Sequence, residues 1–549
     1  MTRRESPPVS AWAPSRREAI LSALGVLATA LLVRIWAASM ITFPAPEDTA
    51  YYVGVARNLL AGHGLVSDAL WSYTTPPLVF PRPAFEVWLP LPTLLAAIPM
   101  ALLGSSFSAA QWSAVIVGSL VPVLAWRLGA DLALERRLPA GRGRSIALGS
   151  GLVCAVYLPL VLHSGLPDST MPFAALALAT CLVVARATRM ARPSLRMLVS
   201  LGLLMGVAAL ARNEAAWLAL GWVVAVAGRP GTMAERVRLV GVVGAVALVV
   251  FAPWAARDWL VFGNPLPGQA LANALSLDGR DIFAWQEPPT LARYLAAGPG
   301  AWIGTRLVGL GHNLFSVLLL PGMPMSLIGL AGLAAVARAR ALRPLVLLAG
   351  VTFTATTLLF PVATTWGTFL HAAGPVHVLL IIGCLTALDS AIAAVGRRRG
   401  WSNPTAWLGP SLGVAAGLLF TLALLPAFGE TGREAAGKYA ALRTVLADLD
   451  PAGGPVITDF PIWLAEETGR HSLALPNEQP SSVLDLAARF PGTRLLIVDD
   501  RIDSGRWPSI LAEGLPGSAC FQPVSLPAST GQGAIRALES TRLYRISCP

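Results

Sequence analysis

The chain has 549 residues, of which 55% are hydrophobic and only 13% are charged. Soluble globular domains carry about 25% charged residues, so this composition excludes an ordinary soluble protein. The net charge of +11 does not indicate nucleic-acid binding either, because the arginines form short clusters between apolar runs and not a basic stripe with exposed aromatic residues. Many of these runs reach the roughly 18 residues that cross a bilayer. The sequence therefore predicts a polytopic α-helical membrane protein.

The N-terminal segment is basic and polar, and the first long apolar run follows it at residues 19–41. No small-residue cleavage site precedes a soluble domain, so we expect a retained first span with its N-terminus in the cytoplasm. The loop after this span would then lie outside.

The stretch 46–88 in this loop combines acidic, aromatic and basic side chains. Its opening, PEDTAYYVGVARNLLAGHGL, predicts a short helix with Glu47 and Asp48 in the first turn, where carboxylates meet the positive end of the helix dipole. Such side chains are costly at the mouth of a membrane segment. The stretch is therefore either a site of chemistry or an acidic helix start on a solvated loop. Its candidate substrate-binding residues are Tyr51, Tyr52, Arg82 and Glu86.

Later apolar runs bring the expected number of membrane spans to about 11. Dense arginine clusters occur at every second connection, which places these connections in the cytoplasm and leaves the C-terminal segment outside. The run 88–104 contains Pro90, Pro92 and Pro99, so it predicts an interfacial or re-entrant helix and not a span. The expected spans after the first are 109–129, 146–162, 173–185, 197–210, 217–227, 237–254, 314–335, 345–362, 371–395 and 407–428.

This topology collects further charged side chains at the outer ends of the spans. Carboxylates there could deprotonate a hydroxyl nucleophile or hold a metal, and arginines could bind a phosphate in bidentate geometry. Each candidate also has a structural interpretation, because Asp168 could cap the next span, Arg212 could pair with Glu214, and Arg257 could anchor the chain at the membrane interface. The residues are His163 and Asp168 in HSGLPDST, Arg212 and Glu214 in ARNEAA, and Arg257 and Asp258 in PWAARDWL.

Other polar residues near the spans have simpler interpretations. His163 is expected to pack within its loop. His371 and His377 do not share a helix face well, which predicts packing or pore-lining groups. Asp389 lies near the cytoplasmic arginines and predicts an ion pair with Arg397.

From residue 430 the composition becomes that of a soluble domain. Helices expected at 433–449, 464–470 and 481–490 alternate with strands at 455–460 and 494–500, which predicts a small α/β layer with a parallel sheet. A strand pair near 520–526 and 542–548 would close it. We therefore divide the chain into a transmembrane domain of residues 1–429 and an extracytoplasmic α/β domain of residues 430–549.

The cysteines contain one candidate disulfide. Cys520 and Cys548 lie on the two closing strands, where an oxidising compartment would permit a bridge. The remaining cysteines lie in spans and are expected to pack there. The sequence has no CxxC or histidine-rich pattern, so a structural zinc site is not expected.

Taken together, these segments resemble one family. The chain is similar to the GT-C glycosyltransferases in its first span and in the tracts EDTAYYVGVARNLLAGHGL, RPAFEVWLPLPTLLAAIPMALLG, SGLPDST, ALARNEAAWLAL and PWAARDWLVFGNPLP. In layout it is similar to the protein O-mannosyltransferases and the lipid A aminoarabinose transferases. The resemblance covers roughly the first 270 residues, and the later spans match by layout alone. It implies a GT-C-like fold.

The resemblance also implies a reaction and its residues. Such enzymes transfer a sugar, with inversion, from a polyprenyl-phosphate donor to a glycan, lipid or protein acceptor outside the cell. The first-loop carboxylate that acts as base or positions the acceptor falls on Asp48 or Glu47, and the second-loop aspartate falls on Asp168. The order Glu-Asp departs from the usual Asp-Glu, which leaves open which of the two acts.

The residues that would bind the phosphate match the pattern of the family less well. No lysine precedes the Pro-Pro-Leu element at 76–78, so Arg82 is the nearest cation, followed by Arg212 and Arg257 as candidates. The C-terminal domain is similar to domains appended to bacterial members, where such a domain helps to bind the acceptor. No cofactor is expected, although a divalent cation is possible.

Two other functions compete with the transferase. A transporter or lipid-linked-sugar flippase would favour inverted repeats and charges within the spans, whereas the charges here lie at the outer rim. A non-catalytic scaffold would use its outer domain to bind envelope polymer. The expected location is the plasma or inner membrane, with a polyprenyl-phosphate sugar, membrane lipid and an acceptor as partners.

Overall fold

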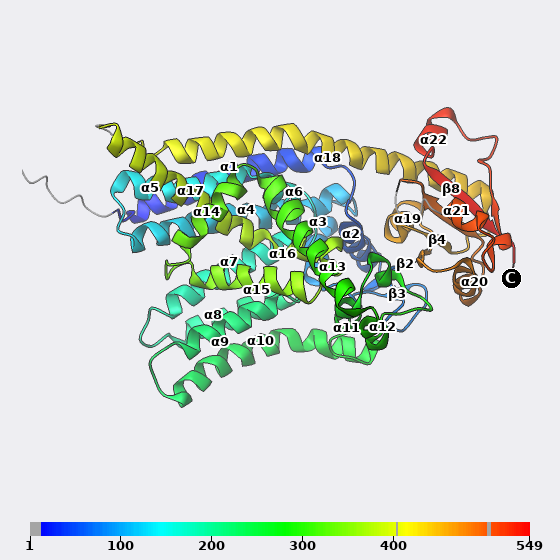
Figure 1. The fold of residues 1–549 in the computed structure, drawn as a ribbon, viewed down its shortest axis with the longest axis horizontal. Helices are drawn as coiled ribbons and strands as arrows, with labels where there is room; N and C mark the ends of the chain where they lie inside the picture. Colours follow the sequence, from blue (N-terminus) through cyan, green and yellow to red (C-terminus); the bar gives the residue numbers. More distant parts are fainter. Residues whose placement is uncertain (1–11, 402–404, 502–506, 549) are drawn as a thin grey trace, which may run out of the picture.

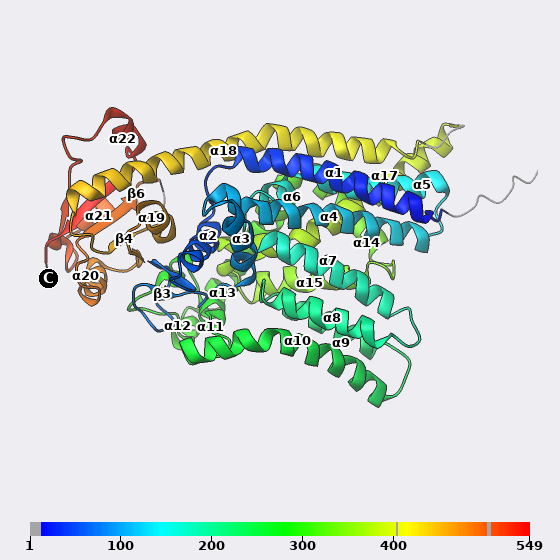
Figure 2. The same cartoon turned by 180° about the vertical axis from the view of Figure 1, so that it is seen from behind.

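The computed structural model describes residues 12–401, 405–501 and 507–548. Figure 1 shows a long bundle of helices with a small domain of strands and helices at one end, and Figure 2 shows the same arrangement from behind. The C-terminus lies in the small domain. The structure therefore has the helical membrane part and the C-terminal α/β part that the sequence predicts.

The bundle is built from apolar helices. Seven helical segments in the described ranges are long and apolar enough to cross a bilayer: α1 (Arg16–Met40), α4 (Phe107–Glu135), α7 (Thr170–Ala187), α10 (Met233–Phe262), the run Gly298–Gly322, α17 (Gly374–Arg398) and α18 (Leu408–Leu449). The shorter helices of the bundle are α3 (Leu91–Leu103), α5 (Ala140–Val156), α6 (Leu158–His163), α8 (Leu195–Ala209), α9 (Ala215–Ala227), α14 (Met325–Val336) and α15 (Arg343–Leu358). The chain is a multi-pass membrane protein, and the number of about 11 spans stays a prediction.

The arginine clusters lie together at the end of the bundle opposite the small domain. Glu135 at the end of α4 accepts a hydrogen bond from Arg189 after α7, at 2.9 Å, and another from the backbone N–H of Arg340 after α14, at 2.6 Å. Arg144 of α5 pairs with Glu18 of α1 at 2.8 Å. Connections far apart in the sequence thus share one charged face, as the positive-inside pattern predicts.

Two local predictions within the bundle are wrong. Asp389 of α17 pairs with Arg142 and not with Arg397, because α17 packs against α5 and presents Asp389 to it. The single span expected at 314–335 is interrupted, because Pro321 and Pro324 lack the N–H that a continuous helix needs. This region consists of α13 (Gly298–Gly311), the π-helix η2 (His312–Leu319), the short turn η3 (Leu320–Gly322) and then α14.

Helices α14 and α17 approach each other through glycines. A Cβ atom on Gly332 would lie 2.1 Å from the carbonyl oxygen of Gly383, and one on Gly329 would lie 2.4 Å from that of Leu380. Small residues allow membrane helices to pack at such short distances. The contact therefore leaves no space for even one methyl group.

The small domain is a mixed six-stranded sheet with helices around it. Its strand order is β2-β5-β4-β6-β8-β7, in which the first four strands are parallel and the last two run antiparallel to their neighbours. The predicted strands near 455–460, 494–500, 520–526 and 542–548 are confirmed, whereas β5 was not predicted. The strands are β4 (Val456–Thr458), β5 (Ser472–Ala474), β6 (Leu495–Asp499), β7 (Phe521–Pro523) and β8 (Thr541–Ile546). The helical elements are α19 (Pro461–Thr468), α20 (Pro480–Arg489), α21 (Trp507–Ala512), η6 (Ser518–Cys520) and α22 (Gln532–Ala537).

One strand of this sheet comes from the first outer loop. Strand β2 (Ala69–Leu70) pairs in parallel with β5, and the Tyr73 hydroxyl donates a hydrogen bond to the carbonyl oxygen of Ala474 at 2.5 Å. The same loop contains α2 (Glu47–Leu60) and the antiparallel pair β1 (Val66–Ser67) and β3 (Arg82–Pro83). Helix α18 runs without a break from the bundle through residue 430 into the domain. The two parts are thus joined by both a loop strand and a helix.

The remaining outer segments contain only short helices. The loop after α10 carries short surface helices, and a further pair of short helices precedes α17. These elements are α11 (Ala270–Leu275), η1 (Gly279–Phe283), α12 (Leu291–Ala296), η4 (Ala363–Trp366) and α16 (Thr368–Ala372). The expected disulfide is confirmed, since Cys520 and Cys548 are bonded with their Cα atoms 5.2 Å apart.

Replacing Gly332 by Ala should destabilise the bundle. The new methyl group would meet a backbone carbonyl of α17, and overpacking of this kind costs roughly 1–3 kcal/mol. Thermal unfolding of the purified protein in detergent measures the loss. Gly244→Ala in α10 is the matched control, because no atom lies within 4 Å of its added Cβ, and it should keep the wild-type midpoint or raise it slightly, since Ala is the better helix former. Equal midpoints for the two variants would contradict the close α14–α17 contact.

Cysteine labelling from outside the cell should reach probes at His63 and Ala452 but not one at Gly141. All three positions are exposed, and the native cysteines are either buried or bonded to each other, so background labelling should be low. The arginine end that contains Gly141 is expected in the cytoplasm. Labelling at Gly141 with protection of the other two would invert the predicted topology.

Candidate active site

The side chain of His371 lies between two carboxyl groups at the domain end of the bundle. Its Nε2 atom is 3.0 Å from Oδ2 of Asp48, which begins α2, and its Nδ1 atom is 3.5 Å from Oδ2 of Asp168 in the second outer loop. Nδ1 is also 2.8 Å from the hydroxyl oxygen of Thr170. Three outer segments, two of which the sequence analysis selected, therefore meet at one imidazole.

The second outer loop is fixed by polar side chains from the first spans. Buried Arg34 of α1 donates hydrogen bonds to the Ser164 hydroxyl at 3.0 Å and to the carbonyl oxygen of Ala155 at 3.1 Å. The amide of Gln111 donates to the carbonyl oxygens of Ile41 and Gly165 at 2.9 and 2.8 Å. Buried donors without partners are costly, so these contacts hold the loop in one conformation.

Asp168 is not the N-cap of α7, which is Ser169, but its carboxylate binds a backbone N–H at the start of that helix and contacts His163 as well. One carboxylate oxygen accepts the backbone N–H of Thr170 at 2.7 Å, at the start of α7. The other lies 3.1 Å from Nδ1 of His163. The carboxyl group is 1% exposed, so its orientation is set entirely by protein groups. Asp168 can therefore hold the start of α7 and also belong to the candidate site.

The charges in this cluster oppose the effect of burial. Burial by itself would lower the pKa of His371, but the carboxylates of Asp48 and Asp168 outweigh it and raise the pKa to about 10. Burial likewise disfavours the ionised form of Asp168, yet His163 and His371 hold the pKa of its carboxyl well below its usual range. The two carboxylates thus favour the charged form of the His371 imidazole.

Arg212 joins the same cluster from the end of α8. It makes a bidentate pair with Glu214 at 3.0 and 2.8 Å, as the ion-pair interpretation predicts. It also donates to the hydroxyl of Ser169 at 2.8 Å and to the carbonyl oxygen of Thr368 at 3.0 Å. Arg212 thus ties the second outer loop to the segment that carries His371. Tyr52 of α2 hydrogen-bonds with the same Ser169 and is buried.

Glu47 points away from this cluster. Its carboxylate accepts the backbone N–H groups of Ile462 and Trp463 at 2.9 and 3.4 Å, at the start of α19. Burial raises the pKa of Glu47 to about 8, although these two donors oppose the rise. A second contact joins the same helices, because Arg57 of α2 pairs with Glu466 of α19 at 2.5 Å. The two neighbouring acids of the sequence motif thus have different partners.

Arg82, Glu86 and Tyr51 form a separate buried group. Arg82 lies 3.1 Å from Glu86, and both side chains are almost fully buried. Its guanidinium also donates to the carbonyl oxygens of Ser72 and Thr75 at 2.5 and 2.7 Å, and its buried Nε has no hydrogen-bond partner among the described residues. The Tyr51 hydroxyl accepts the backbone N–H of Phe85 at 2.6 Å. These contacts shape the first loop, and a role of this group in substrate binding stays a prediction.

Arg257 is the most exposed of the three candidate arginines, with 22% of its side chain accessible. It pairs with Asp258 at 2.9 Å, and its guanidinium lies 4.9 Å from the centre of the Trp254 ring. Trp254 packs edge-on against Phe85 at 5.4 Å. Because Phe85 also packs against Tyr51, Arg257 lies near the outer face of α2.

One group of side chains could hold a metal ion. His163, Asp168 and His371 offer ligand atoms that lie within 4.8 Å of one another. Imidazole and carboxylate ligands suit first-row divalent cations. A cation bound through Nδ1 of His371 would require that this nitrogen carry no proton.

Sequence reasoning missed His371 because it compared this residue only with His377, with which it does not share a helix face well. His371 begins the expected span 371–395, which places it at the outer rim with the acidic loops. That position was the available signal. His377 lies deeper in α17 and faces the Tyr157 hydroxyl at 3.4 Å, apart from the carboxylates.

Solved structures with the same fold are membrane glycosyltransferases. ArnT from Cupriavidus metallidurans bound to undecaprenyl phosphate superposes with a TM-score of 0.57 over 96% of this chain and 99% of its own, at 15% identity. The oligosaccharyltransferase AglB from Archaeoglobus fulgidus, in complex with an inhibitory peptide and a dolichol-phosphate, gives a TM-score of 0.54 over 93% of this chain and 74% of its own, at 12% identity. No family model matches the sequence, and no curated protein matches it significantly. The chain thus has the GT-C fold that the resemblance implies.

The stability of the folded protein should fall as the pH rises through the titration of Glu47. The folded protein holds the Glu47 proton more tightly than the unfolded chain does, so this contribution is complete below the ordinary pKa of 4.5 and is lost as the pH passes through about 8. Glu466 at the same interface, whose pKa burial raises to about 7, acts in the same direction. Thermal unfolding of wild type and Glu47→Gln between about pH 6 and about pH 9 measures the effect.

The variant should show a smaller fall in midpoint over this range than wild type, because its amide does not ionise. Glu513→Gln, an exposed residue of the same domain, should follow the wild-type curve. Parallel curves for Glu47→Gln and wild type would show that Glu47 does not control this interface.

Proposed function

We propose that the chain transfers a sugar, with inversion, from a polyprenyl-phosphate-linked donor to an acceptor on the extracytoplasmic side of the plasma or inner membrane. The observation that carries the proposal is the meeting of Asp48, His371 and Asp168 at the domain end of a bundle with the GT-C fold. The acceptor would be a cell-envelope glycan, a lipid or a protein.

The lipid donor is supported by two features. Solved structures of the same fold contain undecaprenyl phosphate or dolichol-phosphate. The candidate site of this chain likewise lies at one end of a multi-pass bundle, where a donor anchored in the bilayer can reach it. A soluble nucleotide sugar is not expected outside the cell.

Asp48 is the proposed base. The acceptor hydroxyl must lose a proton as it attacks the sugar, whereas the departing polyprenyl phosphate is already a stable anion. A positioned carboxylate contributes roughly 10²- to 10⁴-fold by taking such a proton. Asp48 is favoured over Glu47 because the Glu47 carboxylate is occupied by the backbone of α19.

His371 and Asp168 are proposed to position this base. The imidazole of His371 bonds the Asp48 carboxylate at one nitrogen, while Asp168 and Thr170 orient the ring from the other side. The other oxygen of Asp48, which accepts the N–H of the adjacent Thr49, is the proposed acceptor of the proton from the substrate hydroxyl. Arg212 supports it by holding Ser169 and Thr368 in place.

Arg257 is the proposed phosphate ligand. Of the three candidate arginines, Arg82 is fully buried against Glu86, and Arg212 uses its donors on Glu214, Ser169 and Thr368. Arg257 has one acidic partner and an accessible guanidinium, which can bind a phosphate in bidentate geometry. Tyr51, Tyr52 and Glu86 would shape the wall of the donor site.

The proposal requires no organic cofactor. A divalent cation at His163, Asp168 and His371 is the alternative to a protonated His371, and both would place positive charge beside the acceptor base. The N-terminus is proposed to lie in the cytoplasm and the C-terminal domain outside, in agreement with the arginine end of the bundle.

Replacing Asp48 by Asn should reduce sugar transfer by roughly 10²- to 10⁴-fold, because the amide cannot accept the hydroxyl proton. Glu47→Gln is the matched control, since the two positions are adjacent on α2 and only one of them faces His371. Membranes that contain equal amounts of each variant are incubated with a panel of labelled polyprenyl-phosphate sugars, and the acceptors are identified by mass spectrometry. A parallel arm with a chelator tests the cation.

Near wild-type transfer by Asp48→Asn would show that this residue is not the base. Loss of transfer on chelation, with recovery on adding a divalent metal, would favour the cation over the protonated His371. Donor binding without transfer to any acceptor would favour the scaffold, and donor movement across the membrane without transfer would favour the flippase.

A further inference from the structure

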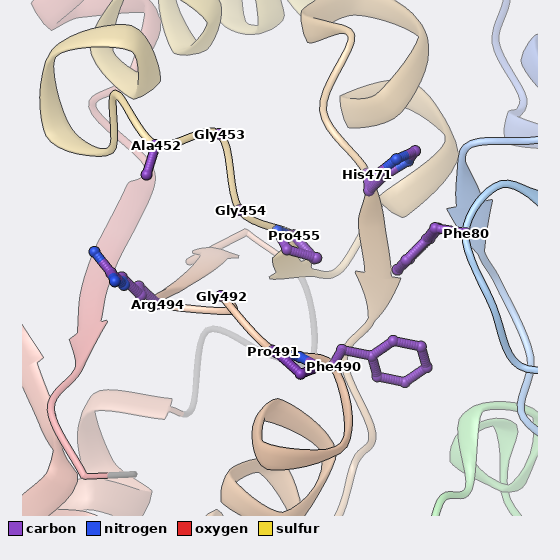
Figure 3. Close-up of a pocket in the computed structure, with 10 residues that line it drawn as sticks. All are labelled: Phe80, Ala452, Gly453, Gly454, Pro455, His471, Phe490, Pro491, Gly492 and Arg494. Atoms are coloured by element: carbon purple, nitrogen blue, oxygen red, sulfur yellow. The ribbon is translucent and has the colours of Figure 1, made fainter.

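The C-terminal domain has a pocket of about 450 Å³ with no assigned role. Figure 3 shows the ten residues that line it, with the side chain of Arg494 at one end and the rings of Phe80, Phe490 and His471 at the other. The turns at Gly453–Pro455 and Pro491–Gly492 lie between these two ends. The pocket is thus cationic on one side and aromatic on the other.

The pocket and the contact of the domain with Glu47 lie at opposite ends of the strands of the sheet. Pro455 directly precedes β4, His471 precedes β5, and Arg494 precedes β6, so the pocket is at the N-terminal ends of three parallel strands. Helix α19, which contacts Glu47, follows the other end of β4. A molecule in this pocket would therefore be held by the domain and not by the residues around Asp48.

The floor of the pocket depends on two glycines. A Cβ atom on Gly454 would lie 2.0 Å from the carbonyl oxygen of Gly492, and Gly492 itself has a φ of +90°. A side chain at position 454 would collide with the other turn, so the glycine allows the two turns to lie this close. The two closely spaced turns form the floor of the pocket, which is bounded by Arg494 at one end and by the aromatic rings at the other.

The charge of the pocket favours an anionic ligand. None of the ten lining residues is acidic, and Arg494 is exposed with no carboxylate partner among the residues that the structure describes. The Arg470–Asp450 pair lies behind Gly453, whose added Cβ would be 3.8 Å from the Arg470 guanidinium. An unpaired, exposed guanidinium binds carboxylate or phosphate groups well.

The other end of the pocket favours a flat ring. Phe80 comes from the first outer loop and stacks on His471 with ring centres 4.6 Å apart and planes at 15°. It also contacts Phe490 at 5.5 Å. Phe80 is half-buried, so part of its ring faces the pocket. Its position is fixed because β2 of the same loop is paired with β5.

We propose that this pocket binds an acidic saccharide, with a sugar ring against Phe80 and the anionic group on Arg494. The volume suits one or two sugar rings and lies within the usual range for small-molecule sites. The choice of a saccharide over another anion rests on the proposed glycosyltransferase function, in which the pocket would hold part of the acceptor glycan away from the reacting hydroxyl. The binding itself requires neither donor nor Asp48.

The test measures binding of cellobiouronic acid and of cellobiose, which differ only in one carboxylate, to the full-length protein in nanodiscs by saturation-transfer NMR. Wild type should bind the acid about tenfold more tightly than the neutral disaccharide, the usual size of one charge-assisted contact. Arg494→Gln should remove this difference. Phe80→Leu should weaken both ligands, because it removes the ring surface.

Arg536→Gln is the matched control, because Arg536 is exposed on α22 of the same domain but does not line the pocket. It should bind both disaccharides as wild type does. Equal binding of the two disaccharides by wild type, equal losses in Arg494→Gln and Arg536→Gln, or binding of an acidic peptide in place of either sugar would each overturn the proposal. The binding test contains no donor, so a failure to bind either disaccharide would not contradict the proposed transfer reaction. In the same way, a failure of the transfer assay would not contradict binding in this pocket.

Discussion

The contact of His371 with Asp48 on one side and Asp168 on the other is the interaction on which the candidate site depends. Each carboxylate comes from a different outer loop, and the imidazole comes from a third segment near the end of the bundle. The ring contacts one carboxyl group through each of its two nitrogens, so a single side chain fixes the position of both.

Helix α2 connects this cluster to the C-terminal domain. Its first turn presents Asp48 to the bundle and Glu47 to α19, so adjacent residues of one motif belong to different parts of the molecule. Arg57, three turns later, contacts Glu466 on the same side as Glu47. The domain thus takes part in placing the helix that carries the candidate base. The position of Asp48 therefore depends on the contacts of α2 with the domain as well as on its contacts with the bundle.

Much of the architecture could be predicted from the sequence, because it follows from local patterns. Apolar run lengths and arginine positions give the helices and the shared charged end, and alternating apolar segments give β4, β6, β7 and β8. Asp48, Asp168 and Arg212 could be selected because charged residues at the rim of a membrane bundle are costly. The partner of each charge could not be predicted, because it depends on how distant segments pack. Three features depend on such packing and could not be predicted. They are the place of His371 in the site, the strand β2 at the edge of the sheet, and the contact of Asp389 with α5.

Helix α18 has a mechanical consequence for the whole molecule. With 42 residues it is about 63 Å long at 1.5 Å per residue, about twice the hydrocarbon thickness of a bilayer. Its outer half therefore acts as a rigid post that sets the height of the domain above the membrane. It also sets the angle of the domain, because each residue of an α-helix adds a rotation of about 100°. Adding or deleting one residue in the outer half would oppose this rotation to the β2–β5 pairing and to the contact of α19 with Glu47, so the spacing along this helix is itself a constraint on the site.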